Sequence, residues 1–266
     1  MLGAPETPYD LRFRLLGIPV RVHPLFWLIS AVMGWRESNL PMVALWVACV
    51  FVSILVHEYG HGLTAKTFRC SPSILLYSMG GLCETRSSRL TPSQYLLVLF
   101  GGPGAGFVLC FVVMLLASAI YGITPSEHVS VAETLVGIQP RIDDYLEAIR
   151  KFHTETNYEI YRMMVWINLM WGLVNLLPIW PLDGGQASEI ILTKVNRSQG
   201  PRWGHIVSLV LAGILAVLAL SVSRGGRDLF LPVFFAFFAY VNYQFLQTIH
   251  QAQAMGLYQD DDWWKR

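Results

Sequence analysis

Charged residues are scarce in this chain of 266 residues. Only 14% of them are Asp, Glu, Lys or Arg, while 54% are hydrophobic and 13% are aromatic. Soluble proteins carry roughly 25% charged residues, and disordered chains are poorer in hydrophobic and aromatic residues. The composition therefore excludes a disordered chain and indicates an integral membrane protein that lies in a lipid bilayer.

Other signals are also missing. The formal net charge is +1, so the chain lacks the basic surface of nucleic-acid-binding proteins, and we expect no nucleic-acid partner. The amino terminus mixes acids, prolines and arginines before its first apolar run, so we expect no removable signal peptide. No CxxC pair is present, which argues against a disulfide framework and a cysteine zinc site; the four cysteines are Cys49, Cys70, Cys83 and Cys110.

Stretches without charge locate the membrane spans, because a bilayer core about 30 Å thick requires roughly 20 apolar helical residues. The sequence predicts an all-α polytopic membrane protein with about six transmembrane helices in a single domain over 1–266. The expected spans are approximately 22–36, 39–66, 92–123, 160–182, 204–223 and 229–247, and an outer loop covers 124–159.

Lysine and arginine counts predict the orientation, because cytoplasmic loops carry more of these residues. With both termini in the cytoplasm, twelve of them lie inside and seven outside. We therefore expect a multi-pass protein of the cell membrane with both termini in the cytoplasm.

Segment 71–86 differs from the helical stretches around it. It contains two short apolar runs around Gly80 and Gly81, a pair that is typical of a hairpin turn. We expect a short β-hairpin here.

The strongest functional motif is HEYGH at 57–61, at the end of the second span. Residues four apart lie on one face of an α-helix, so the His57 and His61 imidazoles can point at one metal ion. Glu58 beside them can take a proton from the attacking water, as in other HExxH motifs. An interfacial polar cluster is the structural alternative, but it leaves three ionisable groups at the end of an apolar helix without compensation.

A catalytic zinc ion usually has three protein ligands, and Asp183 is the expected third. Pro178 and Pro181 break the fourth span, and the Gly184–Gly185 pair allows the backbone to reverse. At 1.5 Å per residue, His57 and Asp183 lie about 27 and 30 Å from the outer membrane face. The two half-sites are thus expected at similar depth near the cytoplasmic side, whereas the alternative for Asp183 is a loop acid just beyond the bilayer.

Two asparagines lie on the segment before Asp183. The amide of Asn168 or Asn175 can stabilise an oxyanion or bind a peptide backbone, and hydrogen bonding between helices is the alternative. The position of Asn175 favours it for the functional role.

Other conspicuous residues receive structural interpretations. Gly102 and Gly106 have the spacing of small residues that lets helices approach closely, and their cluster lacks the GK[ST] of a phosphate-binding loop. The remaining histidines have no ligand spacing and are expected to be solvated or interfacial: His23, His128, His153, His205 and His250.

Together these motifs resemble the site-2 protease family of intramembrane zinc metalloproteases. The similarity consists of HEYGH at 57–61, NLLPIWPLDGG at 175–185, GGPGAG at 101–106 and RVHP at 21–24, and covers about 160 residues. It implies a three-helix catalytic core and the span before it. Many relatives carry an asparagine where this chain has Gly106, and no PDZ or CBS domain is expected.

The resemblance implies one Zn²⁺ ion bound by His57, His61 and Asp183, with Glu58 and Asn175 as catalytic residues. It also implies that the hairpin is membrane-associated and presents a strand edge to the substrate. The expected function is regulated intramembrane proteolysis: hydrolysis of peptide bonds within or next to the transmembrane segments of membrane proteins.

A metal-binding membrane transporter or sensor that uses the same ligands without hydrolysis is the alternative function. A carrier has no need of a base beside two ligand histidines, so the presence of Glu58 favours the protease. Two imidazoles and a carboxylate suit zinc, although iron, cobalt or nickel can occupy such a site in vitro.

Overall fold

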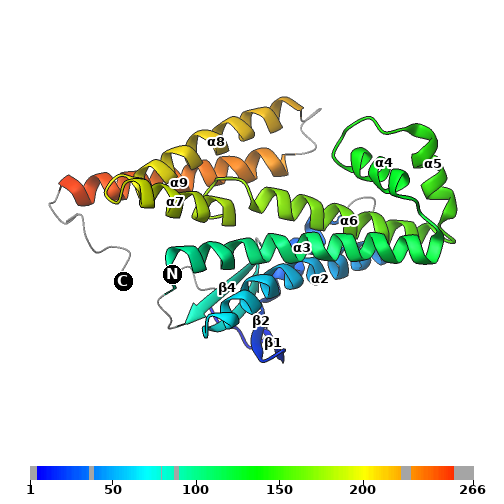
Figure 1. The fold of residues 1–266 in the computed structure, drawn as a ribbon, viewed down its shortest axis with the longest axis horizontal. Coiled ribbons are helices and arrows are strands. Elements are labelled where there is room, and N and C mark those ends of the chain that lie inside the picture. The colour runs from blue at the N-terminus through cyan, green and yellow to red at the C-terminus, as the bar shows by residue number, and fades with distance from the viewer. Residues whose placement is uncertain (1–4, 36–38, 79, 87–89, 223–228, 255–266) are drawn as a thin grey trace. The chain divides into compact units, whose positions relative to one another are not determined.

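The chain is a mostly helical membrane protein with a small mixed sheet (Figure 1). It divides into two compact units, Met1–Leu173 and Val174–Arg266. The computed structural model describes residues 5–35, 39–78, 80–86, 90–222 and 229–254.

The first unit contains a four-stranded sheet in the order β1-β2-β3-β4. Strand β1 (Leu11–Leu15) pairs antiparallel with β2 (Ile18–Val22), and β2 pairs parallel with β3 (Ser71–Tyr77). Strand β3 in turn pairs antiparallel with β4 (Gly80–Arg86). The expectation of an all-α chain with a lone hairpin therefore needs correction, because two further strands precede the first helix.

Hydrophobic alternation explains the two added strands. Ile18, Val20 and Val22 are buried on one face of β2, and they pack in one cluster with Phe26 and Leu76. A period of two is the signature of a half-buried strand. The expected pairing within 71–86 is present, but Gly80 and Gly81 begin β4 instead of forming its turn.

The first helix is short. α1 (Pro24–Met33) has ten residues, about 15 Å of helix, which is half the thickness of the hydrocarbon core. The helix within the expected first span over 22–36 is therefore shorter than the prediction. Val22 belongs to the sheet, and residue 36 lies outside the described residues.

Helices α2 (Leu40–Thr67) and α3 (Pro92–Tyr121) run side by side (Figure 1). They approach closely where Gly60 faces Gly101, because a Cβ atom on either glycine would overlap or crowd the backbone of the other. The small residues that permit this approach are thus Gly60 and Gly101. This contact sets the distance between the two helices beside the HEYGH motif.

The expected outer loop over 124–159 is largely helical. It contains α4 (Pro125–Leu135), α5 (Ile142–Lys151) and the start of α6 (Glu155–Asn175). A salt bridge of 2.6 Å joins Glu127 of α4 to Lys151 of α5. These helices have their own hydrophobic cluster with α3, so the segment is folded rather than an extended connection.

The second unit consists of α7 (Asp183–Val195), α8 (Gly200–Val222) and α9 (Phe230–Ala254), which follow the end of α6. Helix α8 packs along α9 and also contacts α7 (Figure 1). The core of this unit is a hydrophobic cluster in which Ile179 and Leu182 pack with phenylalanines of α9.

Four of the helices among the described residues are long and apolar enough to cross a membrane: α2, α3, α8 and α9. Helix α6 is not among them, because Glu155, Glu159 and Arg162 lie in its first half. The expected fourth span over 160–182 is corrected accordingly: its helix ends at Asn175. Residue 223, the expected end of the fifth span, lies outside the described residues.

Candidate metal centre

Helix α2 places three ionisable side chains in the interior of the first unit. His57, Glu58 and His61 are 2%, 4% and 6% exposed. The Nε2 atoms of His57 and His61 lie 3.1 Å apart, as expected for imidazoles one turn apart on the same helix face. Two ring nitrogens that converge in this way offer adjacent lone pairs to one cation.

The tautomer of His61 suits a metal ligand. Its Nδ1 lies 2.7 Å from the carbonyl oxygen of Val98 on α3. Because a carbonyl can only accept, Nδ1 carries the proton and Nε2 holds a lone pair. A hydrogen bond from the second ring nitrogen to a backbone carbonyl is the usual way in which proteins orient a metal-binding histidine.

Gly102 leaves the space that the two imidazoles occupy. A Cβ atom at this position would overlap the His61 ring and lie 2.7 Å from Nε2 of His57. By contrast, a Cβ atom at Gly106 would make ordinary contacts with Asn168 at 3.8 Å. The predicted packing pair therefore has two different roles, and Gly102 belongs to the histidine site. The donor set and this cradle both fit a bound metal ion.

Glu58 lies against the sheet. A Cβ atom at Gly81 of β4 would overlap the carboxyl group of Glu58, so the absence of a side chain at Gly81 allows the edge strand to approach the carboxylate. The neighbouring Gly80 lies in the left-handed region, with φ of 133°, and has Trp171 of α6 beside it. The sheet therefore places an edge strand next to the candidate base.

Asp183 belongs to the second unit, where it is the first residue of α7. The positive end of the helix dipole stabilises a carboxylate at this position. The loop before it packs tightly on the first turn of α7, because a Cβ atom at Gly184 or Gly185 would overlap the backbone of Leu176 or Ile179. Asp183 thus stands on a fixed loop, as the proline and glycine pattern predicts.

Two polar side chains from α8 and α9 hold the same loop. Ser208 accepts a hydrogen bond from the Trp180 amide at 2.9 Å, and Asn242 donates to the Trp180 carbonyl at 2.7 Å. The Oδ1 atom of Asn242 also lies 2.8 Å from Nδ1 of His205, which therefore donates to it. Neither Ser208 nor Asn242 is predicted from the sequence as a site residue, although Asn242 interrupts an otherwise apolar run.

The two asparagines before Asp183 have different surroundings. Asn168 donates to Ser53 of α2 at 2.9 Å and to the carbonyl of Met164 at 2.8 Å, which is the helix-to-helix role. Asn175 is buried and is the last residue of α6.

Three of the remaining histidines are buried. Burial corrects the expectation for His128 and His205, whereas His23 has the capping role that its position before Pro24 allows. His128 contacts Tyr161 at 2.7 Å and Ser118 at 2.8 Å, and burial lowers the pKa of His128. His205 is bonded to Asn242. The Nδ1 atom of His23 caps α1 by accepting from the amide of Leu25.

The fold and the histidine site define a membrane-embedded protein with a metallopeptidase motif whose histidines and glutamate are buried. The chain belongs to peptidase family M50, whose family model matches residues 45–220.

Comparisons with known proteins illustrate the similarity. The chain is 25% identical over 208 residues to Zinc metalloprotease MJ0392 of Methanocaldococcus jannaschii, covering 77% of this chain and 50% of that protein. It is 26% identical over 179 residues to Stage IV sporulation protein FB of Bacillus subtilis, covering 66% and 49%. The chain thus spans about half the length of the curated relatives that it matches. The solved Site-2 Protease from Methanocaldococcus jannaschii has the same fold, with a TM-score of 0.55 at 22% identity over 89% of this chain and 94% of that one.

Proposed function

We propose that this chain is a zinc endopeptidase that hydrolyses peptide bonds within or next to the transmembrane segments of membrane proteins. The observation that carries the proposal is the buried pair of converging imidazoles with Glu58 beside it, on an apolar helix of a family M50 protein. Relatives of the chain are named zinc metalloproteases. Burying three ionisable groups on an apolar helix costs free energy, and a bound metal ion compensates this cost.

One Zn²⁺ ion is held by His57, His61 and Asp183 in this proposal, and the two units form one peptidase domain. Neutral imidazole nitrogens and a carboxylate oxygen are common zinc ligands, and three protein ligands leave one position open for catalysis. Support comes from the tautomer of His61, the space at Gly102 and the tight packing of the loop that precedes Asp183.

Glu58 acts as the general base and then as the general acid. Its carboxylate takes a proton from the attacking water, whose oxygen forms the new bond to the peptide carbonyl carbon. As the carbon–nitrogen bond breaks, Glu58 delivers this proton to the leaving amine. Zinc, when bound, supplies a Lewis acid that polarises the carbonyl and acidifies the water.

The substrate is bound as an extended strand, because a helical peptide bond is shielded and already hydrogen-bonded. Strand β4 lies at the edge of the sheet and approaches Glu58 at Gly81, so its free edge suits the addition of a substrate strand. The amide of Asn175 stabilises the oxyanion or holds the substrate backbone. The hairpin is membrane-associated in this arrangement.

The orientation in the membrane follows the lysine and arginine counts. Both termini and the metal centre lie on the cytoplasmic side of a multi-pass protein of the cell membrane, with a membrane-spanning protein as the substrate. Six crossings are part of this proposal. The four long helices supply four of them, and the α1 and α6 segments supply the other two.

The purified full-length chain in proteoliposomes with a single-span substrate tests the proposal. Glu58→Gln abolishes cleavage while Glu133→Gln on α4, the matched control, leaves it unchanged. Cleavage by the Glu58→Gln variant at the parent rate would refute a protease with this base. Zinc flux that survives Glu58→Gln, without cleavage by either protein, would instead support the transporter.

A further inference from the structure

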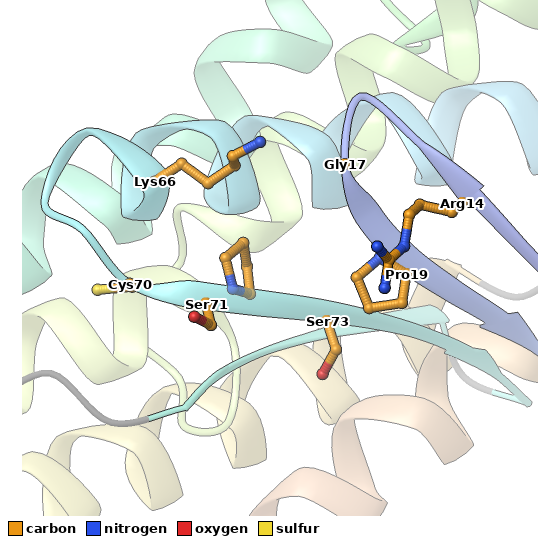
Figure 2. Close-up of a pocket in the computed structure, with 8 residues that line it drawn as sticks. Arg14, Gly17, Pro19, Lys66, Cys70, Ser71 and Ser73 are labelled. Carbon is orange, nitrogen blue, oxygen red and sulfur yellow. The ribbon is translucent and has the colours of Figure 1, made fainter.

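A cavity of about 560 Å³ lies where the end of α2 meets β1, β2 and β3. Its lining includes Arg14, Lys66, Ser71 and Ser73 but neither metal-centre histidine. Figure 2 shows Lys66 reaching from α2 toward the turn that contains Gly17, on one side of the cavity. The cavity is separate from the metal centre in its residues and has a different chemistry.

The sheet opens at this point because two strands diverge. Strands β2 and β3 pair only from Val20 with Ile74 to Val22 with Leu76. The residues before them on both strands, among them Pro19 and Ser73, line the cavity instead. The opening is therefore built by the pairing register of the sheet and not by a loop alone.

The charge that lines the cavity is positive. Arg14 and Lys66 are its charged residues, and no carboxylate lines it. On the same sheet, Arg12 pairs with Glu6 at 2.9 Å and Arg21 pairs with Asp10 at 3.0 Å.

Arg14 and Lys66 differ from these two arginines. Among the described residues, Arg14 makes no salt bridge, and its guanidinium turns toward Pro19, its partner across the two strands (Figure 2). Lys66 donates to the carbonyl of Leu16 at 2.8 Å, which holds the ammonium group beside Gly17. Two cations without a carboxylate partner here suit an anionic ligand.

The length of α2 places this cavity at the level of lipid headgroups. Lys66 follows Leu40 by 26 residues, which corresponds to about 39 Å of helix. A helix that starts at one boundary of a hydrocarbon core about 30 Å thick therefore ends about 9 Å beyond the other boundary. Phosphate groups of lipids lie in this layer, and basic pockets beside spans bind them.

We propose that this cavity binds the phosphate group of an anionic phospholipid. Arg14 and Lys66 supply charge-assisted hydrogen bonds to the phosphate oxygens, and the hydroxyl groups of Ser71 and Ser73 add neutral donors. The acyl chains extend along the apolar surface of α2. A soluble phosphate compound shares this chemistry, but it has no reason to bind at the membrane edge.

Lipid retention by the purified full-length protein tests the site. The protein is exchanged into nanodiscs that contain equal amounts of phosphatidylglycerol and phosphatidylcholine, re-extracted in detergent, and its bound lipid is measured by native mass spectrometry. The parent is expected to retain phosphatidylglycerol preferentially. Arg14→Gln with Lys66→Gln reduces that preference about 25-fold, because each basic residue contributes roughly a fivefold factor near an anionic surface.

Two further variants separate specific binding from general effects. Arg141→Gln with Arg150→Gln removes two exposed positive charges at α5 that do not line the cavity. Because the preference is specific to the cavity, this variant is expected to keep it within about twofold, below the fivefold effect of one cavity residue. Arg14→Gln alone keeps the contact between Lys66 and Leu16, so it reduces the preference about fivefold without disturbing that turn.

Three results would overturn the proposal: equal retention of the two lipids by the parent, an unchanged preference in the double variant, or an equal loss in the α5 control. Equilibrium dialysis with inorganic phosphate distinguishes the soluble source. Phosphate binding that depends on Arg14 and Lys66, in a parent that shows no lipid preference, would overturn the lipid assignment and leave a soluble phosphate site.

Discussion

Gly102→Ala tests whether the space between α3 and the two histidines is required for metal binding. The added Cβ atom would overlap the His61 ring and lie 2.7 Å from Nε2 of His57. Ordinary contacts begin near 3.4 Å, so the rings must move by at least about 0.7 Å. Metal–ligand distances tolerate only about 0.2 Å. We therefore expect zinc affinity to fall at least tenfold, with cleavage lost in parallel.

The assay is the zinc that purified protein retains against a competing chelator, read together with helical content by circular dichroism. Gly104→Ala is the matched control, because it lies on the same helix and its Cβ atom would meet nothing within 4 Å. Both substitutions raise helix propensity by about 1 kcal/mol. Equal zinc affinity in Gly102→Ala and Gly104→Ala would refute the reasoning, as would loss of helical content in Gly102→Ala alone.

Three further predictions concern other parts of the chain. Asn242→Leu removes the hydrogen bonds to Trp180 and His205, so zinc affinity falls about tenfold in chelator competition, while Gln247→Leu on the exposed side of α9 leaves it unchanged. Burial raises the pKa of Glu189 from 4.5 to about 7, so the folded state binds this proton more tightly than the unfolded state. The resulting stabilisation is full below pH 4.5 and is lost as the pH rises through 7, and Glu189→Gln removes this dependence in thermal unfolding between pH 5 and 8. Lys151→Met leaves Glu127 buried without its 2.6 Å partner and lowers the unfolding free energy of the α4–α5 region by about 2 kcal/mol, measured by hydrogen exchange; unchanged exchange there would contradict this estimate.

The sequence predicts the metal motif well because HEYGH depends only on local geometry. Once an apolar run fixes a helix, the four-residue spacing brings His57 and His61 together, as observed. The helices α2, α3, α8 and α9 follow from composition for the same reason. The proline and glycine pattern likewise predicts the loop before Asp183.

Features that depend on distant contacts were missed. The strand over 18–22 was not predicted. Val22 was assigned to the first span because it continues into an apolar run, and the hydrophobic alternation before it is short. His128 and His205 were expected to be solvated or interfacial, since a histidine's partner, here Tyr161 or Asn242, is not visible from local spacing. Gly102 was interpreted as a packing residue. Its contact with His57 and His61 was not visible from the sequence, because these histidines lie 45 and 41 positions before it in the chain.

Zinc content per chain in four purified proteins tests the central claim most directly. The parent and Glu58→Gln should each bind one zinc ion with similar affinity, because Glu58 is the base and not a ligand. His61→Ala and Asp183→Ala should each lose zinc at chelator concentrations that the parent withstands, since each leaves two ligands. Undiminished zinc affinity in Asp183→Ala, or loss of zinc in Glu58→Gln, would contradict the assignment of ligands and base.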